Sequence, residues 1–239
     1  MKNALVTGGS GGIGTAICRR LAADGCHVYI HAHRGHQAAQ TLADAICAGG
    51  GSAQVLAFDV TDSIAVANVL TPLVERQPIQ ILVNNAGIHD DVVFPGMRAE
   101  QWRRVIDVSV NGFFNVTQPL IMPMMRSRWG RIINVSSIAA LTGNRGQVNY
   151  SAAKGALNSA TKSLAQEVAS RGITVNAVAP GIIDTPMSES AFDAQDIARM
   201  VPMKRAGTPA EVADLIGFLA STQAAYITGQ IISINGGII

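Results

Sequence analysis

A glycine-rich loop between a short apolar run and an amphipathic segment restricts the fold of this chain more than any other feature. Residues 4–7 form the apolar run, residues 8–14 read Gly-Gly-Ser-Gly-Gly-Ile-Gly, and Ile13, Ile17 and Leu21 then recur at helical spacing. Glycines allow a tight turn and let the backbone approach a charged group, which the positive end of the following helix attracts. A simple flexible turn would not need this strand–loop–helix context. The context therefore predicts a site for the pyrophosphate of a dinucleotide.

Short β-type runs alternate with longer helical patterns along the whole chain. Several runs are apolar almost throughout, as expected for strands that are buried on both faces. This alternation implies right-handed crossovers and ligands bound beyond the carboxyl ends of parallel strands. The sequence therefore predicts an α/β, Rossmann-type doubly wound sandwich with a seven-stranded parallel sheet and helices on both faces. The strands are expected at residues 4–7, 27–32, 53–58, 79–84, 130–136, 174–179 and 230–234.

Length and composition fit a single domain that spans residues 1–239. The chain is 48% hydrophobic and 14% charged, and no Pro/Ser/Gly-rich or charge-rich linker divides it. A formal charge of +2 gives no reason to expect nucleic acid. The apolar start is too short for a signal peptide and no later segment is long enough to span a membrane, so we expect a cytoplasmic protein. Cys18, Cys26 and Cys47 lack metal-binding or redox spacing, so no metal is expected.

The end of the second predicted strand indicates which dinucleotide the loop binds. A site for NAD usually carries Asp or Glu there, and that acid binds the 2′-hydroxyl of the adenosine ribose. Here residues 27–32 continue into His33 and Arg34 without an acidic residue. A guanidinium offers a planar fork to a 2′-phosphate, so the sequence favours NADP, with NADPH as the hydride donor. The alternative is that Arg34 is a solvated loop residue.

Tyr150 and Lys154 are four residues apart in an alanine-rich helical segment, so their side chains share one face. A cation beside a phenol favours the phenolate and lowers the pKa of the tyrosine. Such a tyrosine can donate a proton to a carbonyl oxygen while hydride arrives at carbon. The spacing alone would equally fit a surface pair. However, Ser136 and Ser137 close a predicted strand at the edge where the cofactor would bind, and a hydroxyl there can hydrogen-bond the substrate oxygen.

These features together resemble the short-chain dehydrogenase/reductase family over essentially the whole chain. The resemblance implies that Ser137 polarises the substrate carbonyl, that Tyr150 is the acid, and that Lys154 holds the nicotinamide ribose and tunes Tyr150. The matching segments are Thr7-Gly8-x-x-x-Gly12-x-Gly14, Asn84-Asn85-Ala86-Gly87, Ser137 before Tyr150-x-x-x-Lys154, and Pro180-Gly181.

The resemblance also implies a set of cofactor contacts, to which Tyr150 and Lys154 contribute. One group would bind the adenine and its ribose, and a second group would bind the nicotinamide carboxamide. The first group is Gly8, Ser10, Gly12, Ile13, Gly14, His33, Arg34, Asp59, Val60, Asn85, Ala86 and Gly87, which includes the pyrophosphate loop. The second group is Pro180, Gly181, Ile183 and Thr185.

The chain departs from the family at one catalytic position. The family usually carries an asparagine seven positions after a tryptophan equivalent to Trp102, and this asparagine is thought to hold a water that relays protons to the lysine. Here that position is Ser109. Asn111 is a poor substitute, because residues two apart on a helix lie about 200° apart around its axis. We expect Ser109 to hold the water on a shorter arm and to give a slower relay.

Within the family, the chain is most similar to 3-oxoacyl-[acyl-carrier-protein] reductases of bacterial fatty acid synthesis. The resemblance implies a substrate that acyl carrier protein presents, with Gln147 facing the incoming thioester and residues 183–205 forming a mobile lid. A further similarity is to reductases of aryl polyene pathways, which also act on carrier-bound chains. The fatty acid similarity lies in residues 143–150, 167–176 and 224–229, and the polyene similarity lies in residues 90–95, 118–124 and 231–237.

An acidic carrier protein would need a basic landing surface. Arg126, Arg128 and Arg131 cluster near one predicted helix end, and Arg171 ends the catalytic helix. Arg128 and Arg171 match basic positions that carrier protein contacts in the fatty acid reductases. The alternative is that these are ordinary solvated arginines at helix C-termini, where they suit the helix dipole.

Two alternatives for the function stay open at this point. The substrate could be another ketone, such as acetoacetyl-CoA, a sugar or a polycyclic alcohol, because loops of unknown shape form the pocket. The chain could also be a nucleotide-binding scaffold that has lost catalysis, for which Ser109 is the only motivation.

The family resemblance further implies a homotetramer, paired through helices around residues 105–127 and 151–170 and through the last strand. Phe113, Phe114, Leu157 and Leu164 suit such packing, but would also suit a monomer's core.

Overall fold

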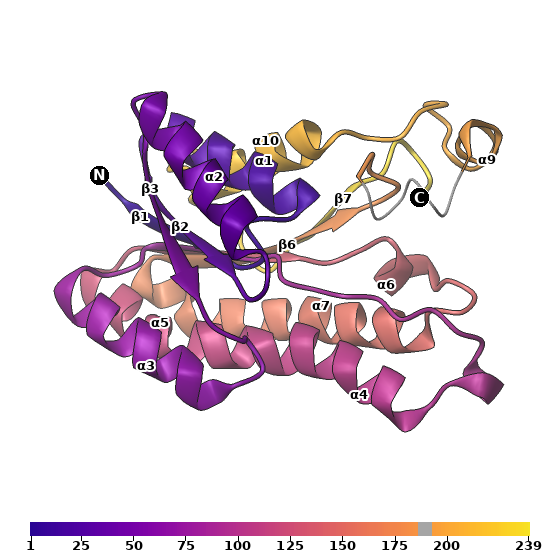
Figure 1. Cartoon of the computed structure of the whole chain (residues 1–239), viewed down its shortest axis with the longest axis horizontal. Helices are drawn as coiled ribbons and strands as arrows, with labels where there is room; N and C mark the ends of the chain where they lie inside the picture. The colour runs from indigo at the N-terminus through magenta and orange to yellow at the C-terminus, as the bar shows by residue number, and fades with distance from the viewer. Residues whose placement is uncertain (186–192) are drawn as a thin grey trace.

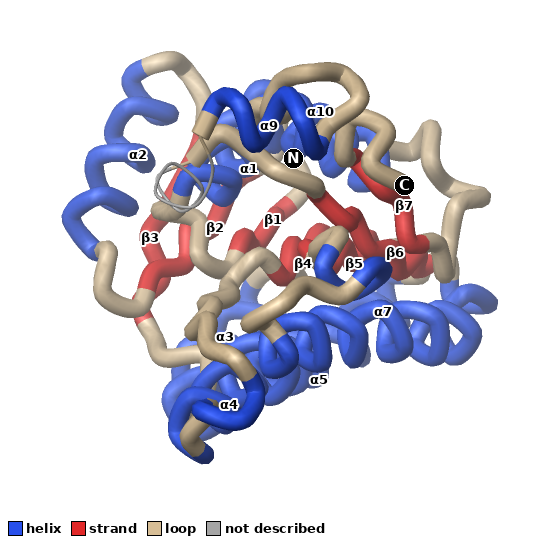
Figure 2. The backbone as a smooth tube through the Cα atoms, turned by 90° about the vertical axis from the view of Figure 1, so that its right-hand side faces the viewer, coloured by secondary structure: helices blue, strands red, loops and turns tan. Residues whose placement is uncertain are grey.

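The computed structural model describes residues 1–185 and 193–239, which contain a seven-stranded sheet with parallel pairing throughout. Figure 2 looks onto the carboxyl ends of the strands, which follow the order β3-β2-β1-β4-β5-β6-β7. The strands are β1 Asn3–Val6, β2 His27–Ala32, β3 Ser52–Ala57, β4 Ile81–Asn84, β5 Gly130–Val135, β6 Ile173–Pro180 and β7 Ile231–Ile234. The predicted Rossmann-type sheet is confirmed, with strand ends that differ from the expected ones by at most two residues.

Helices cover both faces of this sheet (Figure 1). One face carries α1 (Gly12–Ala23), α2 (His36–Ala48) and α10 (Pro209–Ala220), and the other carries α3 (Ser63–Arg76), α4 (Ala99–Ile106), α5 (Gly112–Ser127) and α7 (Val148–Val168). The short helices α6 (Ala139–Thr142) and α9 (Ala194–Met200) lie at the carboxyl edge, on the right-hand side of Figure 1. In the part of the chain that the structure describes, no helix is both long and apolar enough to cross a membrane.

The central strands are mostly apolar because each face of the sheet has its own core. In β1, Ala4 and Val6 pack into the core under α1, α2 and α10, whereas Leu5 between them packs into the core under α3, α5 and α7. Successive side chains of a strand point to opposite faces, so a strand covered on both sides favours apolar residues at consecutive positions.

The segment expected as one long helix at residues 105–127 is interrupted. After α4, a π-helix spans Asp107–Asn111 and α5 then begins at Gly112. Such π-turns insert one extra residue per turn and often occur at functional sites. This π-helix contains Ser109, so the side chain of this predicted catalytic residue points in a different direction than it would in a continuous α-helix.

Candidate active site

The glycine loop between β1 and α1 leaves no room for side chains at two positions. Gly8 has a φ of +62°, in the left-handed region that favours glycine. A Cβ atom on Gly14 would collide with the carbonyl oxygen of Gly8. The backbone therefore turns tightly onto the positive end of α1. This cradle fits the pyrophosphate of a dinucleotide.

A buried histidine that the sequence analysis did not single out holds the glycine loop in place. His31, in β2, is 2% exposed, and its Nδ1 accepts a hydrogen bond from the backbone N–H of Gly8 at 3.1 Å. Its Nε2 lies 2.9 Å from the carbonyl oxygen of Phe58, so Nε2 carries the proton and donates it. Burial lowers the pKa of His31 to about 4, which keeps the imidazole neutral and able to accept from Gly8. A polar residue inside an otherwise apolar strand was the sequence signal for this role.

Residues that follow β4 brace the other side of the glycine loop. The amide Nδ2 of Asn85 donates to the carbonyl oxygens of Thr7 and Gly8 at 2.9 and 3.0 Å. Thr7 Oγ1 accepts from the backbone N–H groups of Asn85 and Ala86 at 3.0 and 2.9 Å. Strands β1 and β4 are neighbours where the strand order reverses, which is where nucleotides bind in such sheets. The structure therefore places Asn85 and Ala86 against the loop.

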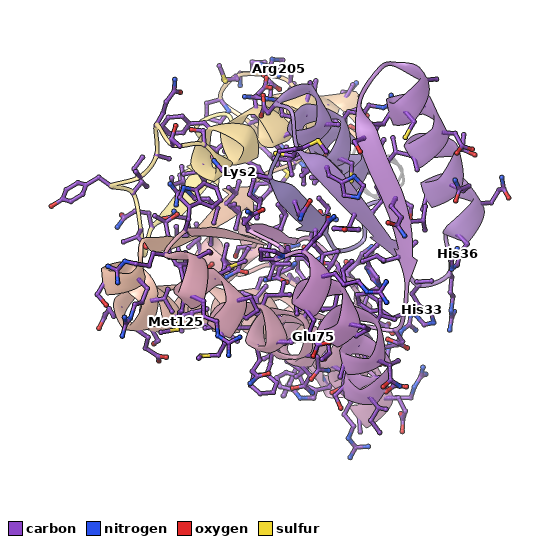
Figure 3. The ribbon with its side chains drawn as sticks, turned by 90° about the vertical axis from the view of Figure 1, so that its left-hand side faces the viewer. Lys2, His33, His36, Glu75, Met125 and Arg205 are labelled. Carbon is purple, nitrogen blue, oxygen red and sulfur yellow. The ribbon has the colours of Figure 1, made fainter. Side chains whose placement is uncertain are left out.

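The predicted adenosine-side residues gather where β2 and β3 end. Figure 3 shows His33 at the corner where β2 passes into α2, and His33 Nδ1 lies 3.5 Å from Asp59 Oδ2. Thr61 donates to Asp59 Oδ1 from both its backbone N–H and its hydroxyl. Partial burial raises the pKa of Asp59, but the bonds from Thr61 and the charges of His33 and Arg34 outweigh it and hold the pKa below its usual range.

The turn that carries Arg34 touches the glycine loop. A Cβ atom on Gly35 would lie 2.7 Å from Ser10 Oγ, so the two loops are in direct contact, and the Arg34 side chain is exposed beside them. Val60 differs from the other predicted residues here. Its side chain packs into the core and its carbonyl oxygen accepts from Asn115 Nδ2 at 2.9 Å, so it supports this corner from beneath.

Ser137, Tyr150 and Lys154 come together at the same edge, between β5 and α7. Ser137 follows β5, and its hydroxyl lies near enough to the phenol of Tyr150, in the first turn of α7, to oppose the rise of that phenol's pKa. Lys154 lies one turn further on, with Nζ 5.6 Å from the centre of the Tyr150 ring. This Nζ donates to the carbonyl oxygen of Val135 at 2.8 Å, and a Cβ atom on Gly87 would lie only 3.0 Å from it. Gly87 thus leaves the space that the ammonium occupies.

Burial shifts both ionisable groups of this trio. Lys154 is 3% exposed, and burial lowers its pKa to about 8. Burial raises the pKa of Tyr150; the hydrogen bond from Ser137 opposes this rise, and the negative charge of Asp91 adds to it. The expected lowering of the Tyr150 pKa by Lys154 is therefore wrong for this structure, because burial raises this pKa and Lys154 is not among the groups that shift it. A phenol that keeps its proton is suited to donate it to a substrate oxygen.

A chain of buried amides aligns the catalytic helix with the sheet. Asn84 Nδ2, at the end of β4, donates to Asn134 Oδ1 at 2.9 Å and to Thr117 Oγ1 at 3.1 Å. Asn134 Nδ2 donates in turn to Thr161 Oγ1 on α7 at 2.8 Å. Asn149, also buried, donates from Nδ2 to backbone oxygens before and within α4 and fixes the first turn of α7. These bonds hold Tyr150 in register, and sequence spacing gave no signal for them.

Ser109 lies in the π-helix and is 2% exposed. Its Oγ has no hydrogen-bond partner among the described residues. A buried hydroxyl of this kind normally bonds to protein or to ordered water. Asn111 is exposed and donates from Nδ2 to Asp107 Oδ1 at 2.7 Å, so it does not replace Ser109.

The predicted nicotinamide side follows β6. A Cβ atom on Gly181 would lie 2.8 Å from Cβ of Asn235, and Ile183 is buried with its backbone bridged to Gly207. Thr185 precedes residues 186–192 of the predicted lid, which lie outside the described residues. Of the remaining lid, α9 stands over the carboxyl edge (Figure 2).

The residues predicted for carrier-protein docking meet where α5 and α7 end. Arg128 and Arg171 are both exposed and, with Arg126, line one hollow, and Arg128 Nη2 donates to the carbonyl oxygen of Ser170 at 3.2 Å. Arg131 does not belong to this surface. It is buried in β5, where its guanidinium donates to backbone oxygens and lies over the ring of Trp129. The strand position, which turns it inwards, explains the difference.

Comparison with known proteins agrees with this geometry. The short chain dehydrogenase family matches residues 2–196. The chain is 44% identical to a 3-oxoacyl-[acyl-carrier-protein] reductase of Aggregatibacter actinomycetemcomitans, with 98% of each chain covered. It is 44% identical to the protein of that description in Escherichia coli (99% of this chain, 96% of that one), and 43% identical to an acetoacetyl-CoA reductase of Allochromatium vinosum (98% and 97%). With this match over most of its length, the chain belongs to the short chain dehydrogenase family.

Proposed function

We propose that the protein is an NADPH-dependent oxidoreductase that reduces a 3-oxoacyl thioester on acyl carrier protein to the 3-hydroxyacyl thioester. The observation that carries the proposal is the grouping of three side chains at the carboxyl edge, where the Ser137 hydroxyl acts on the Tyr150 phenol and Lys154 Nζ lies 5.6 Å from the centre of the Tyr150 ring. The substrate class comes from relatives that cover nearly the whole chain and are described as 3-oxoacyl-[acyl-carrier-protein] reductases. The cytoplasm, as predicted from the sequence, is the proposed place of action.

The reduction divides between the cofactor and three side chains. When bound, NADPH would supply a hydride to the carbonyl carbon. Ser137 Oγ would donate a hydrogen bond to the carbonyl oxygen, and Tyr150 would transfer its phenolic proton to that oxygen as negative charge develops there. Lys154, whose Nζ already donates to Val135, would hold the nicotinamide ribose and stabilise the phenolate that remains. Bulk water or a water held at Ser109 would then return a proton to Tyr150.

NADP rather than NAD is the proposed cofactor because of the corner at the end of β2. At that corner His33 and Arg34 are exposed, the next residue, Gly35, lies against Ser10 of the glycine loop, and His33 Nδ1 lies 3.5 Å from Asp59 Oδ2. A guanidinium can bind the 2′-phosphate with two parallel hydrogen bonds. Replacing Arg34 with Ala should raise the KM for NADPH about tenfold and leave the KM for NADH nearly unchanged.

Docking of the carrier protein is proposed at the hollow lined by Arg128 and Arg171. Reversing both charges (Arg128→Glu with Arg171→Glu) should lower kcat/KM on a carrier-bound substrate and spare a small acyl thioester. The control is Arg19→Glu with Arg76→Glu, an equal charge change on exposed arginines of α1 and α3. Equal losses on both substrates would reject the docking surface.

A second candidate substrate is acetoacetyl-CoA, because one relative of 43% identity is described as an acetoacetyl-CoA reductase. A homotetramer is also proposed, and the exposed apolar side chain of Phe114 on α5, at 62% exposure, suits an interface. Leu157 is already buried within the chain and does not bear on assembly.

The first test follows the absorbance of NADPH after acetoacetyl thioester is added, with NADH in parallel. Fast oxidation of NADPH and little of NADH is the expected result. No oxidation with either cofactor, despite measurable binding of NADPH, would reject the 3-oxoacyl substrate and leave a different ketone or a scaffold without catalysis. Carrier-bound, CoA-bound and longer or polyunsaturated acyl chains, compared by kcat/KM, then separate the fatty acid, CoA and aryl polyene substrates.

A further inference from the structure

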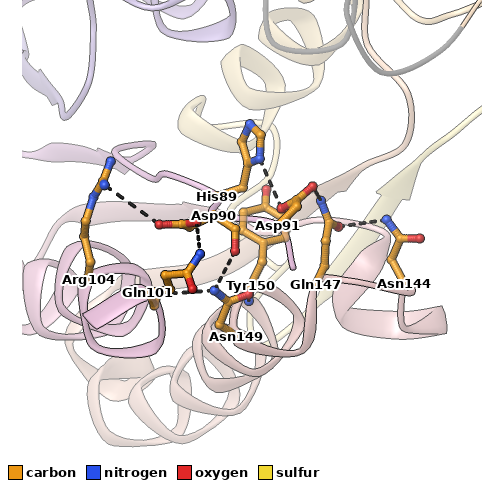
Figure 4. Close-up of polar contacts among 9 residues, drawn as sticks. All are labelled: His89, Asp90, Asp91, Gln101, Arg104, Asn144, Gln147, Asn149 and Tyr150. Carbon is orange, nitrogen blue, oxygen red and sulfur yellow. Dashed lines mark hydrogen bonds and ion pairs between the residues drawn. The ribbon is translucent and has the colours of Figure 1, made fainter. Parts of the chain in front are cut away.

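The loop that follows β4 holds a polar network beside the catalytic trio (Figure 4). Asp91 Oδ2 accepts a hydrogen bond from Gln147 Nε2 at 2.7 Å, and Asp91 Oδ1 pairs with His89 Nδ1 at 3.1 Å. Gln147 Oε1 accepts in turn from Asn144 Nδ2 at 2.9 Å. The Asp91 carboxylate therefore joins this loop to the turn before α7, next to Tyr150 in the view of Figure 4.

The backbone on both sides of Asp91 is tied to the catalytic helix. The carbonyl oxygen of Asp90 accepts from Asn149 Nδ2 at 3.0 Å, and the backbone N–H of Val92 donates to the carbonyl oxygen of Gly146 at 2.8 Å. These two bonds fix where the Asp91 side chain starts. The carboxylate itself is 44% exposed, so an incoming substrate can reach the pair that it forms with Gln147.

The neighbouring acid points elsewhere. Asp90 Oδ1 accepts from Gln101 Nε2 at 2.7 Å, and Asp90 Oδ2 lies 3.8 Å from Arg104 Nη1 (Figure 4). Both partners belong to α4, so this carboxylate is directed away from Gln147. Two adjacent acids with different partners provide a matched comparison within one loop.

We propose that Asp91 has two separable roles in the reductase function proposed above, on which this inference rests. Its hydrogen bond positions Gln147 at the substrate mouth, and its negative charge acts on the Tyr150 phenol. Asp91 is a positioning residue, since it acts through these two side chains. An asparagine at this position would keep an oxygen that accepts from Gln147 and would remove the charge, so the two roles can be measured apart.

The other charged groups around Tyr150 determine how strongly the charge of Asp91 affects the phenol. Among the described residues, Lys154 faces the phenol from α7, and Asp91 with its partner His89 faces it from the loop after β4, while Ser137 contributes a hydroxyl from the end of β5. The charge of Asp91 raises the pKa of Tyr150. Because the carboxylate is partly exposed, water screens this effect, and we expect its removal to lower the pKa of Tyr150 only modestly.

Steady-state kinetics with acetoacetyl thioester test the first role. Asp91→Asn should leave KM within about twofold, whereas Asp91→Ala and Gln147→Ala should each raise it about five- to tenfold, as expected for loss of a hydrogen bond to a charged group. The double variant Asp91→Ala with Gln147→Ala should be no worse than either single variant, because both remove the same interaction. A KM of the double variant near the product of the two single increases would mean that the effects are independent and would overturn the positioning role.

Ultraviolet titration of the tyrosine phenols, without substrate, tests the second role. The step that disappears in Tyr150→Phe belongs to Tyr150, and it should move to lower pH in both Asp91→Asn and Asp91→Ala but not in Asp90→Asn. An unchanged step in Asp91→Asn would overturn the charge role. If the wild-type protein fails to reduce the thioester, the proposed function and the role of Gln147 fall together, and the titration still decides the role of the charge.

Discussion

The cofactor edge and the substrate edge of the candidate site are held in different ways. At the cofactor edge, the glycine loop is fixed by buried or half-buried bonds: His31 binds Gly8 from β2, and Asn85 binds the carbonyl oxygens of Thr7 and Gly8. At the substrate edge, Gln147 is held by Asp91 through a bond between exposed side chains.

This difference predicts which edge can adapt. Breaking a buried hydrogen bond leaves an unsatisfied polar group, whereas the partners of an exposed bond can bind water instead, so its loss costs less. The cofactor edge is therefore preformed, and the substrate edge can rearrange when an acyl chain arrives. Such a division suits a fold whose relatives are described by both carrier-bound and CoA-bound substrates.

The largest expected effect separates chemistry from cofactor binding. Tyr150→Phe removes the proposed acid and should lower kcat by about 10²- to 10⁴-fold. Because the cofactor edge is held by other residues, the Kd for NADPH should change by less than about fivefold, the equivalent of one hydrogen bond. Turnover of NADPH and calorimetric binding measure the two quantities. A large loss of NADPH affinity would show that the two edges are not independent.

The next effect tests the buried histidine of the cofactor edge through pH. Burial lowers the pKa of His31 to about 4 in the folded state, while an unfolded chain has the ordinary histidine value of about 6.5. The unfolded state therefore binds a proton first as the pH falls, and the stability that neutral His31 contributes is present above about pH 6.5 and is lost towards pH 4. The expected loss is about 3 kcal/mol of unfolding free energy.

Urea unfolding at several pH values measures this loss, with His31→Gln as the comparison. The glutamine does not titrate, so the difference in unfolding free energy between the two proteins should shrink as the pH falls from about 6.5 to about 4. A constant difference across this range would mean that His31 is not held neutral in the fold.

A smaller effect tests the shape of the glycine loop. Gly14→Ala places a Cβ atom against the carbonyl oxygen of Gly8 and should raise the Kd for NADPH at least about tenfold. Gly155→Ala is the control, because a Cβ atom there meets open space inside α7 and should add about 0.5–1 kcal/mol of stability. Wild-type affinity in Gly14→Ala would show that the cofactor edge is more adaptable than its bonds suggest.

Sequence patterns predicted the parts of the site that depend on the chain's local order. The glycine loop, Ser137 and Asn85 each follow the end of a strand. Parallel strands bring their carboxyl ends to one edge of the sheet, so these residues lie at the same edge. Helical spacing likewise predicted that Tyr150 and Lys154 share a face. The local order of the chain does not predict contacts between segments that are distant in the sequence.

Three features of the site were not predicted from the sequence, because each depends on the surroundings of a residue in the folded chain. His31 was read as one more strand residue because its partners, Gly8 and Phe58, are fixed only when β2 lies between β1 and β3. Arg131 was grouped with the surface arginines because the sequence does not show that this charged position of β5 is buried. The direction of the Tyr150 pKa followed from burial, which spacing does not measure.

The smallest expected effect concerns Ser109, which lies in the π-helix between α4 and α5. Its buried Oγ lacks a partner among the described residues, which fits a water held there for the proton relay. Under this proposal Ser109→Asn, with a longer arm, should raise kcat about threefold, and Ser109→Ala should lower it by a similar factor, each equivalent to less than about 1 kcal/mol. If no water is held, Ser109→Ala should instead stabilise the fold, because it removes a polar group that is buried without a partner. A clear fall in kcat for Ser109→Asn, in a variant that unfolds at the same urea concentration as the wild type, would contradict the relay.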